Sequence, residues 1–450
     1  FRQPVDQPGP ENQLPAKVTE SEKEMTGAQK LLHLCQRVEL FHTPKGESYA
    51  TIPEEDHLMT FRVDGSNFSE WLGKEYYFRY GKPARSQALT ESLETLKAEA
   101  KYSGEEREVH LRVGGYQGKI YVDLGAAEWR IAEITPDGWN IRSNAPVKFR
   151  RSSSMAALTP PQPGGDINLL RQFVNYGSEA DFRLMVAWLL NAYAPNIPYT
   201  ILVLQGEQGT AKSTTAEFLR MLVDNNQSLL RTVPKSEQDF MVEAHNNWVI
   251  GYDNLSGIAP WLADGMCRLS TGGGFSNRRL YTDMEESIMN AMRPQLVNGI
   301  DDMTSRGDLL DRSIVLELPY IPADERNDKL ALQKQFDRER PFIVGALFDA
   351  ISTALRLYEE VTLSKRPRMA DFARWVTAAE VAFGWEEGTI LQDYGANKKQ
   401  AVDIELNSNP LAIAVRQLMA DKKEWIGRAT ELLEMLEHHL PKDLYSSKAV

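Results

Sequence analysis

The stretch that decides the fold is Gly206-Glu207-Gln208-Gly209-Thr210-Ala211-Lys212-Ser213. It matches the pattern GxxxxGK[ST] except at Ala211, which stands where the pattern has its second glycine. The apolar run 199–204 before it predicts a strand, and the residues after Ser213 predict a helix. A glycine-rich loop between a strand and a helix presents backbone N–H groups to phosphates. The stretch therefore predicts a phosphate-binding loop in an α/β domain.

The residues of this loop have expected roles in binding ATP and Mg²⁺. Lys212 is expected to reach the β- and γ-phosphate oxygens, and the Ser213 hydroxyl to ligate Mg²⁺. Ala211 is small enough to permit a close approach of the backbone to the phosphates. The other nucleotide contacts are assigned to the remaining loop residues, which are Gly206, Glu207, Gln208, Gly209, Thr210 and Thr214. The alternative, a glycine-rich turn before a helix, requires strand, glycines, Lys-Ser and helix to coincide by chance.

A second apolar strand ends in an acid. Residues 247–254 read Asn-Trp-Val-Ile-Gly-Tyr-Asp-Asn, so Asp253 follows Lys212 by 41 residues. An ATPase with such a loop places there the carboxylate that holds a Mg²⁺-bound water, and we expect Asp253 to share the metal with Ser213. The next residue is Asn254 rather than a second acid. Either Asp253 both holds the Mg²⁺-bound water and positions the attacking water, or another residue positions the attacking water.

Two further strands adjoin polar candidates. Residues 292–299 predict a strand that ends at Asn298, where ATPases of this kind have a sensor of the γ-phosphate or of water. The strand 313–318 follows Arg306 and Arg312. An arginine just before such a strand lies at the subunit edge of ring ATPases and can serve a neighbour as an arginine finger. Arg312 is the first candidate and Arg306 the second. A simple turn at Asn298 and solvated salt bridges at the arginines are the alternatives.

Residues 267–283 predict a hairpin. A glycine triplet at 272–274 is followed by Arg278, Arg279 and an alternating run. Such a hairpin suits the gripping of a DNA backbone, because two adjacent cations neutralise phosphates. The alternative is an exposed loop with incidental arginines.

Composition limits the class of protein. The 450 residues are 42% hydrophobic and 25% charged, which is typical of globular domains and suggests two or three of them. The formal net charge of −12 does not advertise a nucleic-acid binder, although a channel could hold local positive charge inside an acidic exterior. Cys35 and Cys267 form no metal-ligand pattern, and no apolar run approaches bilayer length. We expect a cytoplasmic protein with no membrane partner.

Changes in local composition along the chain predict its domain organisation. Alternating runs separated by Gly and Asp-Gly within 108–134 indicate hairpins, and the Pro-rich stretch 152–166 marks a boundary. The expected parts are a flexible tail (1–20), an N-terminal α+β domain (21–150), a linker (151–165), the P-loop core (166–320), a helical lid (321–405) and the start of a winged helix (406–450). We expect the N-terminal domain to be a collar or oligomerisation domain.

The motifs GEQGTAKS, YDNLSG, STGGGFSNRRLYTD, RPQLVNGID and DLLDRSIVLELP follow one another in this order. Over residues 165–390 the chain thereby resembles the superfamily 3, AAA+-type helicases of phages, plasmids and satellite elements. The resemblance implies a Rossmann-like ATPase core, a hexamer, and 3′ to 5′ translocation on single-stranded DNA. It assigns Lys212 and Ser213 to motif A, Asp253 to motif B, Arg278 and Arg279 to the channel hairpin, Asn298 to motif C and Arg312 to the finger.

The resemblance implies an ATP-dependent replicative DNA helicase. Members of the family often carry a primase-polymerase domain upstream, and we recognise none in this sequence. Two other classes of protein stay open. One is an ATP-dependent switch, loader or replication initiator that does not unwind DNA. The other is a degenerate scaffolding module, for which Ala211 and Asn254 are the only hints.

Overall fold

The computed structural model describes residues 19–255, 257–278, 286–299, 307–408 and 410–438. They form two compact units, each of which draws on more than one segment of the chain. The first comprises Phe1–Leu111, Ala127–Ile131 and Arg142–Arg151, and the second comprises Arg112–Ala126, Ala132–Ile141 and Ser152–Val450. No helix among the described residues is both long and apolar enough to cross a membrane.

The first unit is a small α/β layer. Strands β1 (Glu39–His42), β2 (Ser48–Glu54) and β3 (His57–Arg62) are antiparallel neighbours, and β4 (Glu105–Glu106) lies parallel to β1. Helices α2 (Gly27–Leu34), α3 (Ser66–Tyr80) and α4 (Ser86–Tyr102) supply the apolar side chains that pack on the sheet, among them Leu31, Phe68, Leu72 and Leu96. Helix α1 (Glu20–Glu24), the 3₁₀ turn η1 (Cys35–Arg37) and the parallel pair β5 (Val109–His110) and β10 (Lys148–Phe149) complete the unit.

The second unit begins with a four-stranded sheet. Its strands follow one another as β6 (Val113–Tyr116), β7 (Lys119–Asp123), β8 (Ile131–Thr135) and β9 (Gly138–Arg142). The sequence predicted hairpins here but placed them in an N-terminal domain that ends at 150. In the structure most of this sheet packs within the second unit.

The main sheet of the second unit is parallel and has the order β12-β15-β11-β16. Its strands are β11 (Ile201–Gln205), β12 (Ile250–Leu255), β15 (Gln295–Gly299) and β16 (Ser313–Glu317). Each falls within or next to an apolar run that the sequence marked as a strand, so these four predictions are confirmed. Because both faces are covered, the strands are almost continuously buried, as expected of a parallel sheet.

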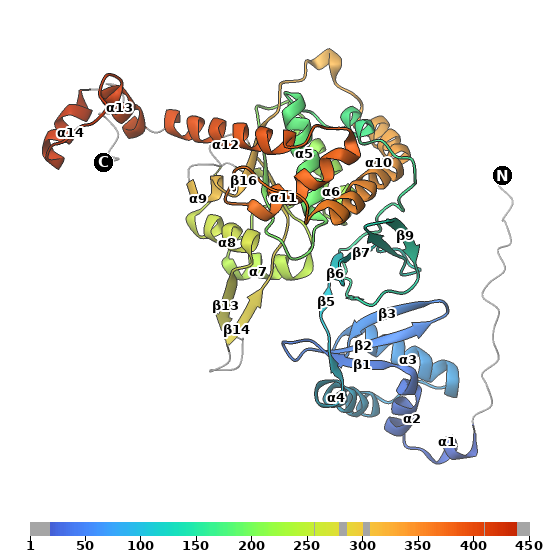
Figure 1. Cartoon of the computed structure of the whole chain (residues 1–450). Coiled ribbons are helices and arrows are strands. Elements are labelled where there is room, and N and C mark those ends of the chain that lie inside the picture. The colour runs from blue at the N-terminus through green and yellow to red at the C-terminus, as the bar shows by residue number, and fades with distance from the viewer. Residues whose placement is uncertain (1–18, 256, 279–285, 300–306, 409, 439–450) are drawn as a thin grey trace. The chain divides into compact units, whose positions relative to one another are not determined.

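Helices cover the main sheet on both faces (Figure 1). On one face lie α7 (Glu237–Asn246) and α8 (Pro260–Thr271), whose apolar side chains join those of β11, β12 and β15 in one core. Helix α6 (Lys212–Val223) contacts the same three strands, and α5 (Glu179–Ala192) contacts β11 and α6. The mixed α/β architecture with a parallel sheet is thus present.

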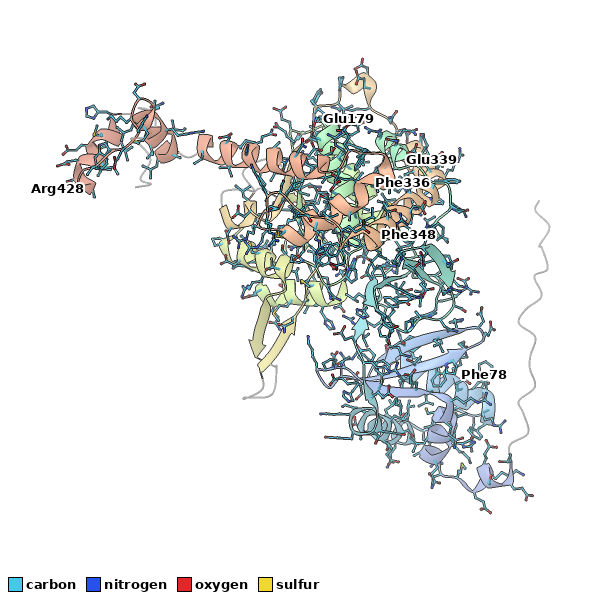
Figure 2. All side chains as sticks on the ribbon, in the orientation of Figure 1. Phe78, Glu179, Phe336, Glu339, Phe348 and Arg428 are labelled. Atoms are coloured by element: carbon cyan, nitrogen blue, oxygen red, sulfur yellow. The ribbon has the colours of Figure 1, made fainter. Side chains whose placement is uncertain are left out.

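Helical segments follow the main sheet. They are η3 (Ala323–Glu325), α10 (Lys329–Leu357), α11 (Ala370–Ala379), η4 (Glu380–Phe383) and α12 (Thr389–Ser408), while the short α9 (Gly307–Leu310) lies between β15 and β16 in the chain. Phe336, which is labelled in Figure 2, lies on α10. Its ring centroid is 5.2 Å from that of Phe173 and 4.4 Å from that of Phe218, so it packs α10 against α6. The described residues after 408 form α13 (Pro410–Met419) and α14 (Ala429–Glu437), and the winged helix stays a prediction.

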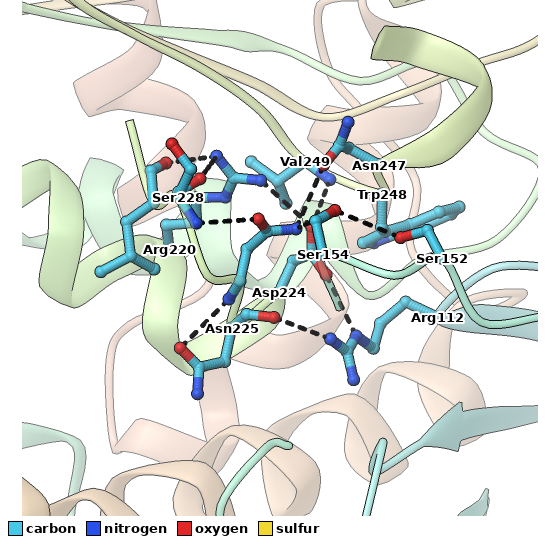
Figure 3. Close-up of polar contacts among 12 residues, drawn as sticks. Arg112, Ser152, Ser154, Arg220, Asp224, Asn225, Ser228, Asn247, Trp248 and Val249 are labelled. Carbon is cyan, nitrogen blue, oxygen red and sulfur yellow. Dashed lines mark hydrogen bonds and ion pairs between the residues drawn. The ribbon is translucent and has the colours of Figure 1, made fainter. Parts of the chain in front are cut away.

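A buried ion-pair cluster fixes the end of α6 and the start of β12 (Figure 3). Asp224 follows α6 and is almost fully buried. Its carboxylate accepts hydrogen bonds from Arg112 Nε at 3.1 Å and from the Val249 backbone N–H at 3.0 Å, and Arg220 Nη2 lies 3.5 Å away. Arg112 also donates to the carbonyls of Asp123, Ala156 and Asn225. The cluster holds the segment before β6, the end of α6 and the start of β12 in fixed register.

Candidate nucleotide and DNA site

The loop between β11 and α6 is shaped by unusual backbone angles. Gly206 has a φ of 142°, and a Cβ atom on it would lie 2.8 Å from the Leu318 carbonyl oxygen, so only glycine fits. Ala211 precedes the first residue of α6 with φ 54° and ψ 30°. This left-handed conformation is the one that glycine adopts most readily, and alanine takes it at a cost of about 1–2 kcal/mol. The loop therefore has the local geometry that the sequence pattern demands, although Ala211 departs from the pattern.

The side chain of Lys212 lies along this loop. Its Nζ donates to the carbonyl oxygens of Gly206 at 2.6 Å and of Glu207 at 2.7 Å, with Thr210 Oγ1 at 3.4 Å. Partial burial lowers the pKa of Lys212, and the charge of Asp253 acts in the opposite direction. The ammonium group is thus held at the mouth of the loop by oxygen atoms of the loop itself.

Ser213 and Asp253 meet at the carboxyl end of the sheet. The Ser213 hydroxyl donates to Asp253 Oδ1 at 2.8 Å. Ser213 is in the first turn of α6, whereas Asp253 is near the end of β12, so the fold brings together residues 40 positions apart. A hydroxyl and a carboxylate oxygen at this distance form the kind of oxygen-rich pair that Mg²⁺ prefers.

Asn298 is joined to the residue after Asp253. The backbone N–H of Asn254, which has a φ of 55°, donates to Asn298 Oδ1 at 2.8 Å. Asn298 lies at the end of β15 and is 1% exposed. Its Nδ2 is buried and, within the part of the chain that the structure describes, has no hydrogen-bond acceptor. A buried donor without an acceptor is costly, and such groups occur where a ligand or water completes the bonding. The side chain of Asn254 is exposed.

Arg312 lies at the amino end of the parallel strands, whereas the phosphate loop lies at their carboxyl end. Its carbonyl oxygen accepts a 2.9 Å hydrogen bond from Ile201 N–H, at the amino end of β11. Strands β11 and β16 run parallel with Ile201 beside Ser313, while the loop follows the carboxyl end of β11 at Gln205. Five strand residues, about 16 Å, therefore separate Arg312 from its own loop. Arg312 Nη1 donates to the Asp308 carbonyl at 2.6 Å. The second finger candidate, Arg306, lies outside the described residues.

Both strands of the predicted hairpin are present in the structure. β13 (Gly274–Arg278) and β14 (Glu286–Asn290) are antiparallel, with Gly274 beside Asn290 and Arg278 beside Glu286 (Figure 1). Arg278 is the last described residue of β13, and Arg279 lies outside the described residues. The hairpin follows α8 and leads toward β15, so it is carried by the same unit as the loop.

Asn175, which the sequence motifs did not identify, makes hydrogen bonds that hold the phosphate loop in place. Its Nδ2 donates to the carbonyl oxygens of Thr210 at 2.9 Å and of Pro319 at 2.7 Å, and its backbone N–H donates to Thr215 Oγ1 at 3.1 Å. One side chain thus joins the loop to the segment after β16. No local motif marks this asparagine, because all of its partners come from distant parts of the chain.

Comparison with known proteins defines the class of the chain. The sequence profile of the replication proteins of actinomycete integrative conjugative elements matches residues 167–401, just over half of the 450 residues. The chain belongs to this family of mobile-element replication proteins. The matched range contains the loop, Asp253, Asn298, Arg312 and the β13–β14 hairpin. Among curated proteins no relative was found.

Solved structures give weaker similarities. A protein described as the active helicase SCCmec type IV Cch superposes with a TM-score of 0.46 at 12% identity, covering 90% of this chain and 86% of that chain. An apo form of the NrS-1 C-terminal region superposes with a TM-score of 0.43 at 11% identity, covering 90% and 84%. Another NrS-1 structure, of residues 305–718, gives 0.41 at 11% identity, covering 92% and 86%. Similarities at this level transfer no activity to the chain.

Proposed function

We propose that this replication protein is an ATP-driven DNA helicase with a P-loop core of the superfamily 3, AAA+ type. The observation that carries the proposal is the 2.8 Å contact between Ser213 and Asp253, beside a lysine held at the mouth of the loop. The loop amides and Lys212 would bind the phosphates of ATP, and Ser213 with Asp253 would hold Mg²⁺. ATP would supply the β–γ phosphoanhydride bond whose hydrolysis, to ADP and phosphate, drives translocation.

The γ-phosphate side of the proposed site would use Asn298. Its orphaned Nδ2 supports a role in contacting the γ-phosphate or the attacking water, because that donor lacks an acceptor among the described residues. Asp253 remains the candidate for activating water, since the exposed side chain at Asn254 is an amide and cannot accept a proton as a carboxylate does. The alternative is that another residue positions the water.

A ring would complete the site. Because Arg312 lies a strand length away from its own loop, it suits a neighbouring subunit better, which supports a homo-oligomer, proposed as a hexamer. The β13–β14 hairpin with Arg278 and Arg279 would grip single-stranded DNA, with translocation proposed as 3′ to 5′. The core is proposed to span 166–320, the helical lid 321–405, and a winged helix to start at 406. The first unit would be a collar or oligomerisation domain, and a primase-polymerase domain is proposed upstream of it.

A second candidate function is an ATP-dependent switch or loader that does not unwind DNA. The observation that favours it is Asn254, an amide where many ATPases have a second acid, because the lack of a separate base slows hydrolysis. Such a protein would bind ATP, assemble on DNA or a partner, and turn over slowly.

Steady-state ATP hydrolysis, measured with and without single-stranded DNA, tests both candidates. Stimulation by DNA, together with unwinding of a duplex that carries a 3′ single-stranded tail, is the result expected of the helicase. Slow hydrolysis that DNA does not stimulate would favour the switch, and no hydrolysis would favour a scaffold. A duplex with only a 5′ tail is the control for polarity, and Lys212→Ala protein is the control for contaminating ATPases.

A further inference from the structure

The segment after β16 folds back over the phosphate loop. The Leu318 backbone N–H donates to the Gln205 carbonyl at 2.9 Å, and the Ile321 N–H donates to the Gly209 carbonyl at 3.2 Å. Together with the Asn175 bond to Pro319, these contacts fix residues 318–321 against the loop. The chain then turns through η3 and enters α10 at Lys329. The residues of this turn are therefore neighbours of the loop, although they lie more than 100 positions later in the sequence.

Arg326 in this turn lies directly against the loop. A Cβ atom placed on Gly209 would be 2.6 Å from Arg326 Nη2 and 3.0 Å from Cε2 of the Tyr320 ring. The guanidinium is held by two bonds, from Nε to the Ile321 carbonyl and from Nη2 to the Tyr320 hydroxyl, each 3.1 Å long. It also lies over the Tyr320 ring, 5.5 Å from the centroid. Both side chains are exposed, so the pair presents a cation and an aromatic face to solvent beside the loop.

A cavity of about 330 Å³ opens at this place. Its walls come from three parts of the chain: the segment Gln172–Asn175, the loop and first turn of α6, and the turn that carries Arg326 and leads into α10. Gly209 and Ala211 of the loop and Thr214 and Thr215 of α6 line the wall. Phe173 in the wall packs against Phe218 and Phe336, which makes one side of the cavity apolar and rigid.

The position of this cavity says which part of a nucleotide it suits. The γ-phosphate end of the site is at Lys212, Ser213 and Asp253, where a metal and the reacting phosphate would meet. Thr214 and Thr215 follow Ser213 along α6 and line the cavity. A chain of phosphates that ends at Asp253 therefore directs its α-phosphate and nucleoside toward the cavity. The other cation there, Lys329, is paired with Glu217 at 2.8 Å.

We propose that Arg326 is a nucleotide-binding residue supplied by the same subunit, which contacts the α-phosphate and nucleoside end that ATP and ADP share. This rests on the proposed function. The guanidinium has a planar fork of donors that suits a phosphate oxygen, and its face can stack on a base. The Tyr320 hydroxyl and the Ile321 carbonyl pre-orient that fork, so little side-chain freedom is lost on binding. Since the residue belongs to the same chain as the loop, its contact does not require a ring.

The test is nucleotide affinity of Arg326→Ala protein, measured with ATP and separately with ADP, in Mg²⁺ and at a protein concentration where sedimentation shows monomers. We expect both dissociation constants to rise, by about tenfold each, because a charge-assisted hydrogen bond is lost from both complexes. Arg326→Lys should recover part of the affinity, and Tyr320→Phe should weaken both nucleotides by a smaller factor. Arg338→Ala removes an exposed arginine of α10 that does not line the cavity, and it should change neither constant.

Each outcome bears on the proposal. Unchanged affinities in Arg326→Ala protein that keeps its melting temperature would overturn it, and so would weakening of ATP alone, which is the signature of a γ-phosphate contact. If Arg326→Ala protein does not fold, Tyr320→Phe and Arg326→Lys decide, and wild-type affinity in both would reject the role. If the wild-type protein binds neither nucleotide while it is folded, the proposed function itself fails. If the wild-type protein binds both nucleotides and the Arg326→Ala protein binds them equally well, only the role of Arg326 fails.

Discussion

The Ser213 hydroxyl donates a 2.8 Å hydrogen bond to Asp253 Oδ1, which joins the start of α6 to the end of β12. Both residues lie at the carboxyl edge of a parallel sheet, where ligands bind in open α/β folds. Within this family of replication proteins, the pair is the strongest structural argument for a site that holds a metal-bound nucleotide. The roles of Ser213 and Asp253 can be distinguished by mutation, because only Asp253 carries a charge.

Asp253→Asn should leave nucleotide binding nearly intact while abolishing Mg²⁺-dependent turnover. The amide can still accept from Ser213, but it lacks the negative charge that holds a metal-bound water. We expect the hydrolysis rate to fall by about 100-fold or more, measured as phosphate release at saturating ATP and Mg²⁺. Asn254→Ala is the matched comparison at the next position. Normal turnover in Asp253→Asn protein would show that the second motif is misplaced.

Lys212→Ala should abolish hydrolysis without unfolding the protein. The variant removes the cation that neutralises the β- and γ-phosphates. Lys212 Nζ donates to three oxygen atoms of the loop itself, so its loss breaks no bond to the core among the described residues. We expect the ATPase rate to fall below about 1% of wild type. Thermal denaturation followed by circular dichroism checks that the melting temperature stays within about 2 °C. An active Lys212→Ala protein would remove the phosphate-loop interpretation altogether.

The sequence was sufficient to locate the strands that build the site. β11, β12, β15 and β16 are short apolar runs, and each contains, precedes or follows a polar residue that the proposed site uses. Because parallel strands end at one edge, the meeting of Ser213 with Asp253 could be expected from the order of the motifs. The hairpin strands β13 and β14 also follow from alternation and the glycine triplet.

Contacts that depend on chain folding could not be predicted in this way. Arg326 lies beside the loop because residues 318–326 fold back over it, and Asn175 reaches Thr210 from a segment 35 positions earlier, and neither residue has a local motif. Arg112 and Asp224 are 112 positions apart and are joined only by tertiary packing. Helices α3 and α4 went unrecognised within the region expected to be α+β, since α3 mixes aromatic and charged residues on most of its surface.

Replacing Arg112 tests the cluster that anchors α6 and β12. Arg112→Met should destabilise the second unit by about 3–5 kcal/mol, because it leaves Asp224 and several carbonyl groups buried with too few partners. Urea denaturation followed by tryptophan fluorescence measures the loss. Arg368→Met is the control, since its 3.4 Å pair with Asp311 is about half exposed on both sides and should contribute less than about 1 kcal/mol. Equal stability of the two variants would contradict a structural role for the cluster.

Arg278→Ala combined with Arg279→Ala should weaken single-stranded DNA binding and uncouple hydrolysis from unwinding. If the hairpin grips the DNA backbone, affinity is salt-sensitive and largely independent of sequence, because counterions are released rather than bases read. The slope of log affinity against log salt should become shallower by about 1.4 for each subunit that contacts the DNA. Fluorescence anisotropy with labelled oligonucleotides of two compositions measures both properties.

The same double variant distinguishes the hairpin from an incidental loop. Basal ATP hydrolysis without DNA should stay near the wild-type rate, while stimulation by DNA and strand displacement are lost. Affinity, salt slope and unwinding that all match the wild type would show that these arginines do not touch DNA. The formal net charge of −12 adds a further expectation, namely weak binding of blunt duplex DNA even at low salt.

The final prediction concerns the sharing of each site between two subunits. Arg312 lies at the amino end of β16, about a five-residue strand away from the loop of its own chain, so it should act on a neighbour. Arg312→Ala protein should bind ATP normally and fail to hydrolyse it, whereas Lys212→Ala protein keeps an intact finger and lacks the loop lysine. In random mixed rings, an intact loop faces an intact finger at about one quarter of the sites when the two proteins are equal in amount. The hydrolysis rate should recover in proportion to the number of these restored sites. It should be highest when the two proteins are equal in amount and lower at any other mixing ratio.

The controls decide which arginine, if either, is shared. A finger that acted within its own subunit would give no recovery at any ratio, because every subunit in the mixture would then lack one half of its site. Arg306→Ala mixed with Lys212→Ala applies the same test to the competing candidate, and recovery with only one of the two arginines identifies the finger. Formation of mixed rings must be shown independently, by co-purification of differently tagged variants. If mixed rings form and neither mixture regains hydrolysis, or if the protein stays monomeric with ATP and DNA, the shared-site ring is wrong. A switch that works within one subunit then becomes the better account of the loop, Asp253 and Asn298.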